Sequence, residues 1–214
     1  MYVPEQFKET RMAVLAQAIR DVELATLVTA GTDGYRASHI PMIFKQVSSE
    51  MFLEGHVARG NDHWRILREP RVSLAVFLGP QTYISPSWYE TKREHGKVVP
   101  TWNYLAVHVS GPLSAVDDKT WLVSHLNELT DMNQQHQERP WQMNDAPADF
   151  LENLMEGIVG LRLKIEEIVG SWKMIQHRKK GDRRGTIAGL ARSADEKNQM
   201  VAQTMQKLEA DRLD

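Results

Sequence analysis

The chain has 214 residues, of which 42% are hydrophobic and 25% charged; these values are ordinary for a globular protein and exclude disorder over the whole length. No cysteine occurs, which excludes disulfides, thiolate metal sites and a cysteine nucleophile. The formal net charge of -2 gives no global attraction to nucleic acid or acidic membranes. Because neither a signal segment nor a membrane-spanning run is evident, we expect a cytoplasmic protein that uses no membrane.

The N-terminal part of the chain predicts a helix followed by strands. Apolar residues at helical spacing, alternating strand patterns and a hairpin signal support this interpretation. The expected elements are a helix over 9–21, strands over 24–29 and 35–44 joined at Asp33-Gly34, and a strand over 51–56.

The middle of the chain continues with a short helix, which Asn61 or Asp62 caps and Pro70 ends. The continuous apolar run over 72–78 predicts a strand that is buried on both faces and ends at Gly79-Pro80. Short strands with interrupting helices favour a mainly β, closed or partly closed sheet over a doubly wound one.

The longest strand candidate covers residues 98–111, where alternating residues predict two packed faces, one of them able to meet a second subunit. Helices are expected from Asp117 and over 148–157, followed by a half-exposed strand around 161–165. A closing helix starts at Ser193-Ala194-Asp195-Glu196, which has the capping-box pattern.

The segment from Gly55 to Asp62 is the most specific local feature of the sequence. A strand ends there, glycines let the backbone approach a ligand, and a helix begins. Amides at the helix start and the fork of Arg59 suit a phosphate group. A tight turn with a solvated arginine explains the same residues.

A second feature is His39-Ile40-Pro41-Met42, in which the proline removes a donor from a strand. This pattern indicates an edge against which a flat ring could lie, although Pro41 could simply block aggregation there. Trp88, Tyr89, Trp102 and Tyr104 add stacking surface for an isoalloxazine or porphyrin ring, but such aromatics are more often core or interface residues.

Residues 172–185 form the only strong basic run. Such a run could hold DNA phosphates, contact an acidic surface of a partner, or be a solvated loop, and no helix-turn-helix accompanies it. The eight histidines show no metal-ligand spacing, but a single one of them could bind haem iron.

Several blocks of the sequence resemble the PaiB-type family of FMN-binding negative transcriptional regulators. They are Met1-Tyr2-Val3-Pro4, His39-Ile40-Pro41, Gly55 to Asn61, Tyr83 to Tyr89 and Val99 to Tyr104, with further matches at Asp145 to Ala148, Ile158 to Gly160 and Trp172 to Met174. The resemblance covers nearly the whole chain. It departs from the family at residues 170–177, where Ser171, Ile175 and His177 replace the usual lysine, serine and asparagine.

The resemblance implies an FMN-binding split β-barrel with flanking helices and a C-terminal helical extension, working as a homodimer with shared flavin sites. Residues 1–170 would form the barrel domain, and residues 171–214 a basic segment and a helix. The phosphate is expected near residues 58–61 and the ring along residues 39–42, with Trp102 and Asn103 supplied across the dimer. The full set expected to bind FMN is His39, Ile40, Pro41, Met42, His56, Ala58, Arg59, Asn61, Trp102 and Asn103.

The resemblance implies a flavin-sensing negative regulator, and any direct contact with DNA would use the basic run, namely Lys173, Arg178, Lys179, Lys180, Arg183 and Arg184. The alternative is an FMN-dependent oxidoreductase of the split-barrel type, for which the sequence assigns no catalytic residue. A third function is haem handling, with His56, His63 or His108 as the iron ligand. No metal site is expected.

Overall fold

The computed structural model describes residues 1–211, which divide into two compact units. The barrel unit contains residues 19–77 and 108–168. The terminal unit contains residues 1–18, 78–107 and 169–211. Among the described residues the structure is a mainly antiparallel sheet with six α-helices, which confirms the expected fold class.

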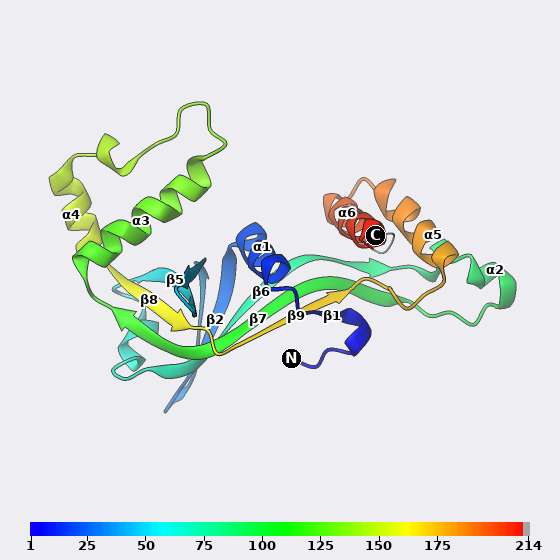
Figure 1. Cartoon of the computed structure of the whole chain (residues 1–214), viewed down its shortest axis with the longest axis horizontal. Coiled ribbons are helices and arrows are strands. Elements are labelled where there is room, and N and C mark those ends of the chain that lie inside the picture. The colour runs from blue at the N-terminus through cyan, green and yellow to red at the C-terminus, as the bar shows by residue number, and fades with distance from the viewer. Residues whose placement is uncertain (212–214) are drawn as a thin grey trace. The chain divides into compact units, whose positions relative to one another are not determined.

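Antiparallel strands in the order β3-β2-β6-β7-β8-β5-β4 build the barrel unit (Figure 1). Their bounds are β2 (Leu24–Gly31), β3 (Gly34–Pro41), β4 (Ile43–Val47), β5 (Glu50–Ala58), β6 (Arg71–Ile84), β7 (Thr101–Val116) and β8 (Ile158–Lys164). The sheet curls until β5 meets the end of β3, where a Cβ atom on Gly55 would lie 2.8 Å from the carbonyl oxygen of Pro41. Inward side chains such as Leu27, Leu53 and Leu161 are fully buried and form the core.

An excursion of two helices leaves the barrel unit between β7 and β8. It contains α3 (Lys119–Gln134), the 3-10 turn η4 (Met143–Asp145) and α4 (Ala148–Glu156). Asp118 caps α3 by accepting a hydrogen bond from the Trp121 amide at 2.6 Å. Val116 pairs directly with Gly160, so the excursion leaves and rejoins the sheet at neighbouring positions.

The terminal unit combines the outer parts of β6 and β7 with helices. It also holds η1 (Glu5–Phe7), β1 (Lys8–Glu9), η3 (Pro86–Trp88), α2 (Thr91–His95), β9 (Glu167–Lys173), α5 (Lys180–Ala191) and α6 (Glu196–Ala210). Within this unit, α5 and α6 lie on one side of the strands (Figure 1). The buried Asp182 of α5 accepts hydrogen bonds from the amide and hydroxyl of Thr91, which joins α2 to α5.

The first helix, α1 (Met12–Val22), begins three residues later than expected. Before it, Glu9 lies in β1 and accepts hydrogen bonds from the amides of Thr10 and Arg11, so the helix cannot include it. The closing helix has its expected cap, since Asp195 accepts from the Lys197 amide. Among the described residues, no helix is long and apolar enough to cross a membrane.

Sequence-based expectations about two strands were wrong. The strand expected over 35–44 breaks at Met42 into β3 and β4. The strand over 72–78 is not buried on both faces, because Val72 is 72% exposed and Leu78 is 49% exposed, and it continues through Gly79-Pro80 to Ile84. Of the three interpretations left open for the basic run, a solvated loop describes only part of it, because α5 begins within it.

Candidate functional site

The outer edge of β3 is open in the described structure. β3 pairs with β2 on one side only, and its residues 39–42 lie where the strand ends. His39 points outward, with Nδ1 3.1 Å from the hydroxyl of Thr26, while Ile40 and Met42 are buried. The unpaired peptide groups of this edge can hydrogen bond a ring with a polar rim.

Arg59 follows β5 and holds both ends of the excursion. Its guanidinium donates to Asp117 at 2.7 Å, to the carbonyl of Glu156 at 2.7 Å and to the carbonyl of Ile158 at 3.0 Å. Arg59 in turn lowers the pKa of the Asp117 carboxyl through this hydrogen bond. Most of the fork is therefore engaged with the protein, so that a phosphate would have to share it with Asp117.

Asn61 links the loop after β5 directly to β3. Its side-chain amide donates to Ser38 Oγ at 3.0 Å, and its side-chain oxygen accepts from the amide of His63 at 2.9 Å, which begins the 3-10 turn η2 (Asp62–Ile66). Of the two caps expected from the sequence, Asn61 or Asp62, the structure uses Asn61. Ser38 precedes His39, so the two segments expected to hold the ring and the phosphate lie together.

Ala58 and Gly60 complete the loop and stay uncovered. Ala58 is exposed, and a Cβ atom on Gly60 would meet nothing within 4 Å. Arg59 closes the loop from behind, because its carbonyl accepts a hydrogen bond from the Trp64 indole at 2.9 Å. The loop thus presents open backbone beside Asn61.

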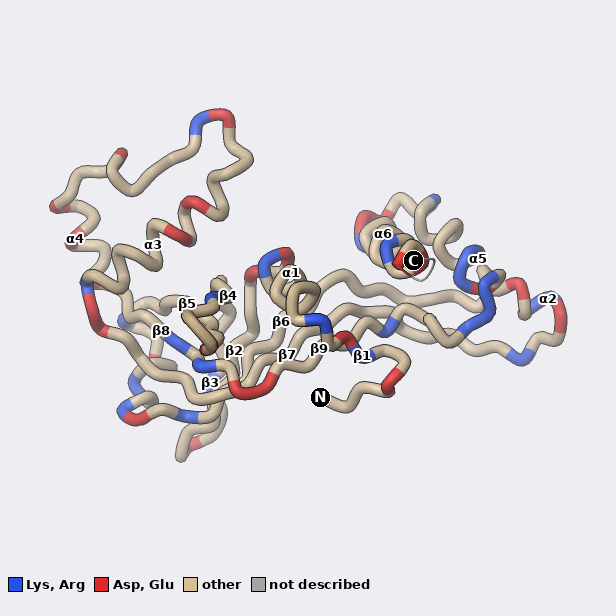
Figure 2. Tube along the Cα trace, viewed as in Figure 1, with Lys and Arg blue, Asp and Glu red and all other residues tan. Residues whose placement is uncertain are grey.

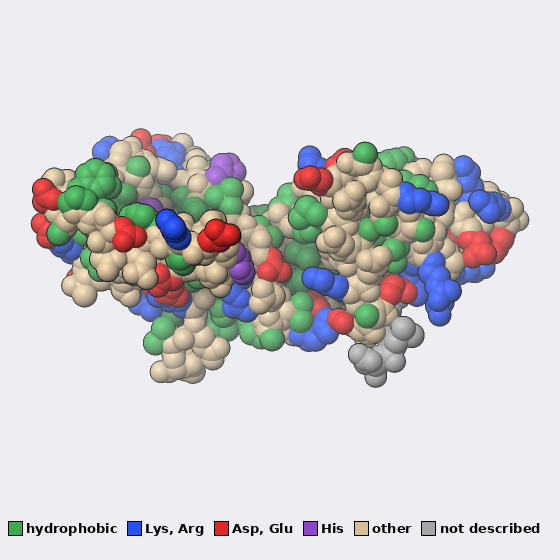
Figure 3. Space-filling model, turned by 90° about the horizontal axis from the view of Figure 1, so that it is seen from above, with side chains coloured by type: hydrophobic (Ala, Val, Ile, Leu, Met, Phe, Trp, Pro, Cys, Tyr) green, Lys and Arg blue, Asp and Glu red, His purple; other side chains and the backbone are tan. Residues whose placement is uncertain are grey.

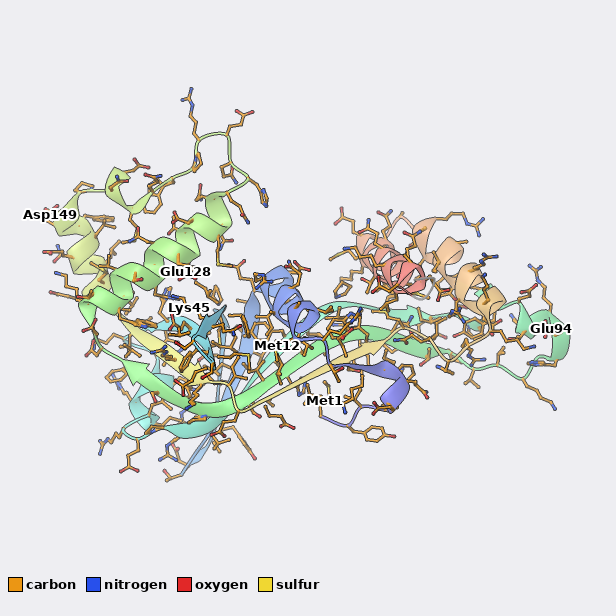
Figure 4. The ribbon with its side chains drawn as sticks, in the orientation of Figure 1. Met1, Met12, Lys45, Glu94, Glu128 and Asp149 are labelled. Carbon is orange, nitrogen blue, oxygen red and sulfur yellow. The ribbon has the colours of Figure 1, made fainter. Side chains whose placement is uncertain are left out.

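His56 belongs to a polar cluster beneath α3. Its Nδ1 lies 3.1 Å from Nε2 of the buried His125, whose ring stacks on Trp121. Desolvation lowers the pKa of both imidazoles, that of His125 to about 4. Lys45 bridges Glu54 and Glu128 in the same cluster; Figure 4 labels Lys45 on the sheet and Glu128 on the helix above it.

Trp102 and Asn103 point to opposite faces of β7 in the terminal unit. Trp102 is half-exposed, with its indole donating to Gln81 at 3.1 Å. Asn103 is fully buried, and its amide lies 3.5 Å from the sulfur of Met205. Their role across a dimer therefore stays a prediction, and for Asn103 it would require access to a side chain that α6 now covers.

The three histidines named as possible haem ligands differ in whether hydrogen bonds already engage their ring nitrogens. Both ring nitrogens of His63 are engaged, one with Ser38 and one with Thr29, so neither can bind iron without breaking this network. His56 shares one nitrogen with His125. Burial lowers the pKa of His108. Within residues 1–211, no group of three or more His, Asp or Glu side chains could hold a metal ion.

Lysine and arginine residues cluster around the start of α5 (Figure 2), and basic side chains reach the surface at the right of Figure 3. The basic run is only partly available to a partner. Lys173 donates to Thr101 and to the Trp102 carbonyl, and Arg183 pairs with Glu209. Arg178 lies over the Tyr89 ring. The exposed members are Lys179, Lys180 and Arg184, of which Lys179 lies 3.3 Å from Glu94.

The altered block ends β9 in an unusual backbone conformation. Ile175, which replaces the family's serine, has a φ of 55° and is buried. Positive φ is rare for a β-branched residue. Gln176 supports this turn by accepting a hydrogen bond from the Met174 amide and donating to the carbonyl of Trp172.

Sequence reasoning missed Thr29, Ser38 and Ser73 behind the loop and named His63 only as a possible haem ligand. All four residues are buried. Hydroxyls at inward positions of three strands were the available signal. The donor set nevertheless fits FMN, because an open strand edge, the Asn61 amide, the Arg59 guanidinium and the uncovered backbone at Gly60 lie at one corner of the barrel unit. Such groups suit a pyrimidine rim and a phosphate.

Solved structures share this fold at low sequence identity. The FAD and haem binding protein from Mycobacterium smegmatis matches with a TM-score of 0.52 and 14% identity, covering 78% of this chain and 73% of that one. The conserved hypothetical protein Rv2991 from Mycobacterium tuberculosis matches with a TM-score of 0.53 and 14% identity, covering 81% and 91%. These likenesses confirm the split-barrel fold.

Protein relatives are closer in sequence. "Protease synthase and sporulation protein PAI 2" of Bacillus subtilis is 32% identical over 206 residues, which cover 96% of this chain and 97% of the relative. A protein of Aspergillus fumigatus, AFUA_5G13800, is 31% identical over 97% of each chain. Residues 1–167 match the family described as "Putative FMN-binding domain". The chain therefore belongs to this family of FMN-binding domains, with FMN as its cofactor and PAI 2 as a relative over its whole length.

Proposed function

We propose that this protein is a homodimeric flavin-sensing negative regulator, with each FMN bound at the corner between β3 and the loop after β5. The observation that carries the proposal is the direct hydrogen bond from Asn61 to Ser38, which joins an open strand edge to an open loop inside a family of FMN-binding domains. The flavin ring would lie along residues 39–42 and its phosphate near residues 58–61.

The phosphate end requires a change at Arg59. Asp117 now accepts from its guanidinium, and an entering phosphate dianion would compete with that carboxylate for the same donors. Asn61 needs no such change, since its amide nitrogen carries a second hydrogen besides the one donated to Ser38.

The dimer proposal rests on large exposed apolar side chains on and next to the strands of the terminal unit. Leu78, Tyr83, Val99 and Trp102 are each about half exposed or more, at 49, 50, 66 and 48%. The opposite face is covered, as the buried Asn103 beside Met205 illustrates. Exposed apolar side chains gathered along β6 and the start of β7 suit a second copy, which would place Trp102 at the partner's flavin.

The regulator role draws on the relative named for protease synthesis and sporulation and on the three exposed cations of α5 and its N-cap. Lys179, Lys180 and Arg184 would neutralise DNA phosphates, and such contacts weaken steeply with salt. A contact through a partner protein would show no such dependence on DNA.

The test begins with the purified protein's absorption spectrum and an FMN titration, followed by molar mass in solution. We expect a flavin spectrum or saturable FMN binding, and a dimer. Trp102→Glu should yield a monomer that binds FMN more weakly, whereas Trp141→Glu, a change at a comparably exposed tryptophan of the excursion, should leave both unchanged. A concentration-independent monomer of the unaltered protein that binds FMN fully would refute the shared site.

DNA binding and turnover separate the regulator from the oxidoreductase. Retention on DNA that falls with salt, and that is lost in the triple variant Lys179→Glu, Lys180→Glu and Arg184→Glu, supports direct regulation. Steady oxidation of a nicotinamide cofactor by the FMN-loaded protein without DNA retention would support the oxidoreductase instead.

A further inference from the structure

A chain of buried hydrogen bonds runs behind the flavin corner, entirely within the barrel unit. Ser38 Oγ lies 3.0 Å from His63 Nδ1, and His63 Nε2 lies 2.9 Å from Thr29 Oγ1. Thr29 Oγ1 lies 2.6 Å from Ser73 Oγ, which reaches the carbonyl of Arg71 at 3.0 Å. His63 sits at the centre of this chain and is 1% exposed.

The two ends of the chain fix its direction. At one end the Asn61 amide nitrogen can only donate, because its side-chain oxygen already accepts from the His63 backbone. At the other end the Arg71 carbonyl can only accept. Every hydroxyl between them then donates towards Arg71, and each group makes one bond as donor and at least one as acceptor.

The direction of the hydrogen-bond chain also determines which ring nitrogen of His63 carries the proton. His63 must accept at Nδ1 from Ser38 and donate from Nε2 to Thr29. The opposite tautomer would leave the Ser38 hydroxyl hydrogen and the Arg71 carbonyl without partners inside the chain, which is costly for buried groups. Burial and the nearby Arg36 guanidinium lower the pKa of His63, so the ring is neutral near pH 7, as a single tautomer requires.

We propose that His63, held as its Nε2-protonated tautomer, is the positioning residue of the flavin site: it locks Ser38 and through it the Asn61 amide, so that β3 and the phosphate loop keep one relative placement. The inference rests on the proposed FMN site. It assigns to His63 no contact with the flavin itself.

The first test determines which ring nitrogen of His63 is protonated in the FMN-free protein. Nitrogen-15 NMR of the FMN-free protein should show His63 with its proton on Nε2 and in slow exchange, and Thr29→Val, which removes the acceptor, should shift the population towards Nδ1. A His63 ring protonated on Nδ1 in the unaltered protein would overturn the inference, whatever the flavin does.

The second test reads FMN affinity by flavin fluorescence. His63→Leu should weaken FMN by more than roughly tenfold, Thr29→Val by up to roughly tenfold, and His63→Gln, which keeps one acceptor and one donor, by less than His63→Leu. Thr32→Val in the β2–β3 turn makes the same change as Thr29→Val outside the chain and should have no effect. If the unaltered protein does not bind FMN, the proposed function is refuted, but the tautomer of His63 found by NMR is not. If all folded variants bind FMN with equal affinity, only the positioning role of His63 is refuted.

Discussion

The polar cluster beneath α3 predicts an unusual dependence of stability on pH. His125 is buried against His56 and Trp121, with the Lys45 ammonium nearby, and its pKa falls to about 4 from the usual 6.5. As pH falls below 6.5 the unfolded chain takes up a proton at His125, whereas the folded chain does so only near pH 4. Between about pH 6.5 and pH 4 the unfolded state therefore binds more protons than the folded state. The free energy of unfolding decreases as pH falls through this range.

The magnitude follows from the difference between the two pKa values. A pKa of about 4 instead of 6.5 corresponds to about 3 kcal/mol that is present above pH 6.5 and absent below about pH 4. Desolvation is the main cause, and the neighbouring His56 and Lys45 contribute repulsion. Glu54 and Glu128, which pair with Lys45, also face the cluster.

The assay is urea unfolding of the unaltered protein and His125→Gln at several pH values from about 7.5 to about 4.5. The difference in free energy of unfolding between the two proteins cancels the carboxylates common to both. We expect this difference to shift by about 2 kcal/mol against the unaltered protein as pH falls. The exposed His136, on the same excursion, provides the control His136→Gln, for which the difference should stay flat. A flat difference for His125→Gln as well would refute the reasoning.

Three further predictions concern packing, a buried carboxylate and the phosphate end. Gly160→Ala would place Cβ 2.3 Å from the Trp121 ring and should cost about 1–3 kcal/mol in thermal unfolding, whereas Gly60→Ala, with open space, should be close to neutral. Asp182→Ala leaves the buried Thr91 amide and hydroxyl without their acceptor and should cost about 2–4 kcal/mol in urea unfolding, more than twice the loss for the exposed cap variant Asp195→Ala. If a phosphate shares the Arg59 fork, Arg59→Ala should weaken FMN at least roughly tenfold and Asp117→Asn should strengthen it; unchanged fluorescence titrations for both would remove Arg59 from the site.

Patterns in the sequence predicted the elements that obey a regular period. The hairpin at Asp33-Gly34 and the cap at Asp195 follow from local chemistry. Helix α5 was missed because its buried stripe is Asp182, Thr186 and Leu190, so no apolar period marks it. Gly185 and Gly189 fit against Trp88, and such a contact depends on packing that distant residues decide.

In the candidate site, too, local features were predictable from the sequence, whereas contacts between distant residues were not. The loop around Asn61 was located correctly, because a strand end, glycines and a capping residue are local signals. The engagement of Arg59 with Asp117 joins residues 58 positions apart, and no local signal predicts it. The hydroxyl chain around His63 also unites three strands, and single polar residues in strand patterns give no sign of their partners.

The polar surface beneath α3 bears on how the excursion arose. Because the excursion leaves at Val116 and returns at its pairing partner Gly160, a short turn could connect β7 to β8 in its place. The surface then uncovered would carry Glu54, His56 and Arg162, which water can solvate. Because β7 pairs with β8 where the excursion leaves and returns, these two helices could be added or removed without changing the order of the strands in the barrel unit.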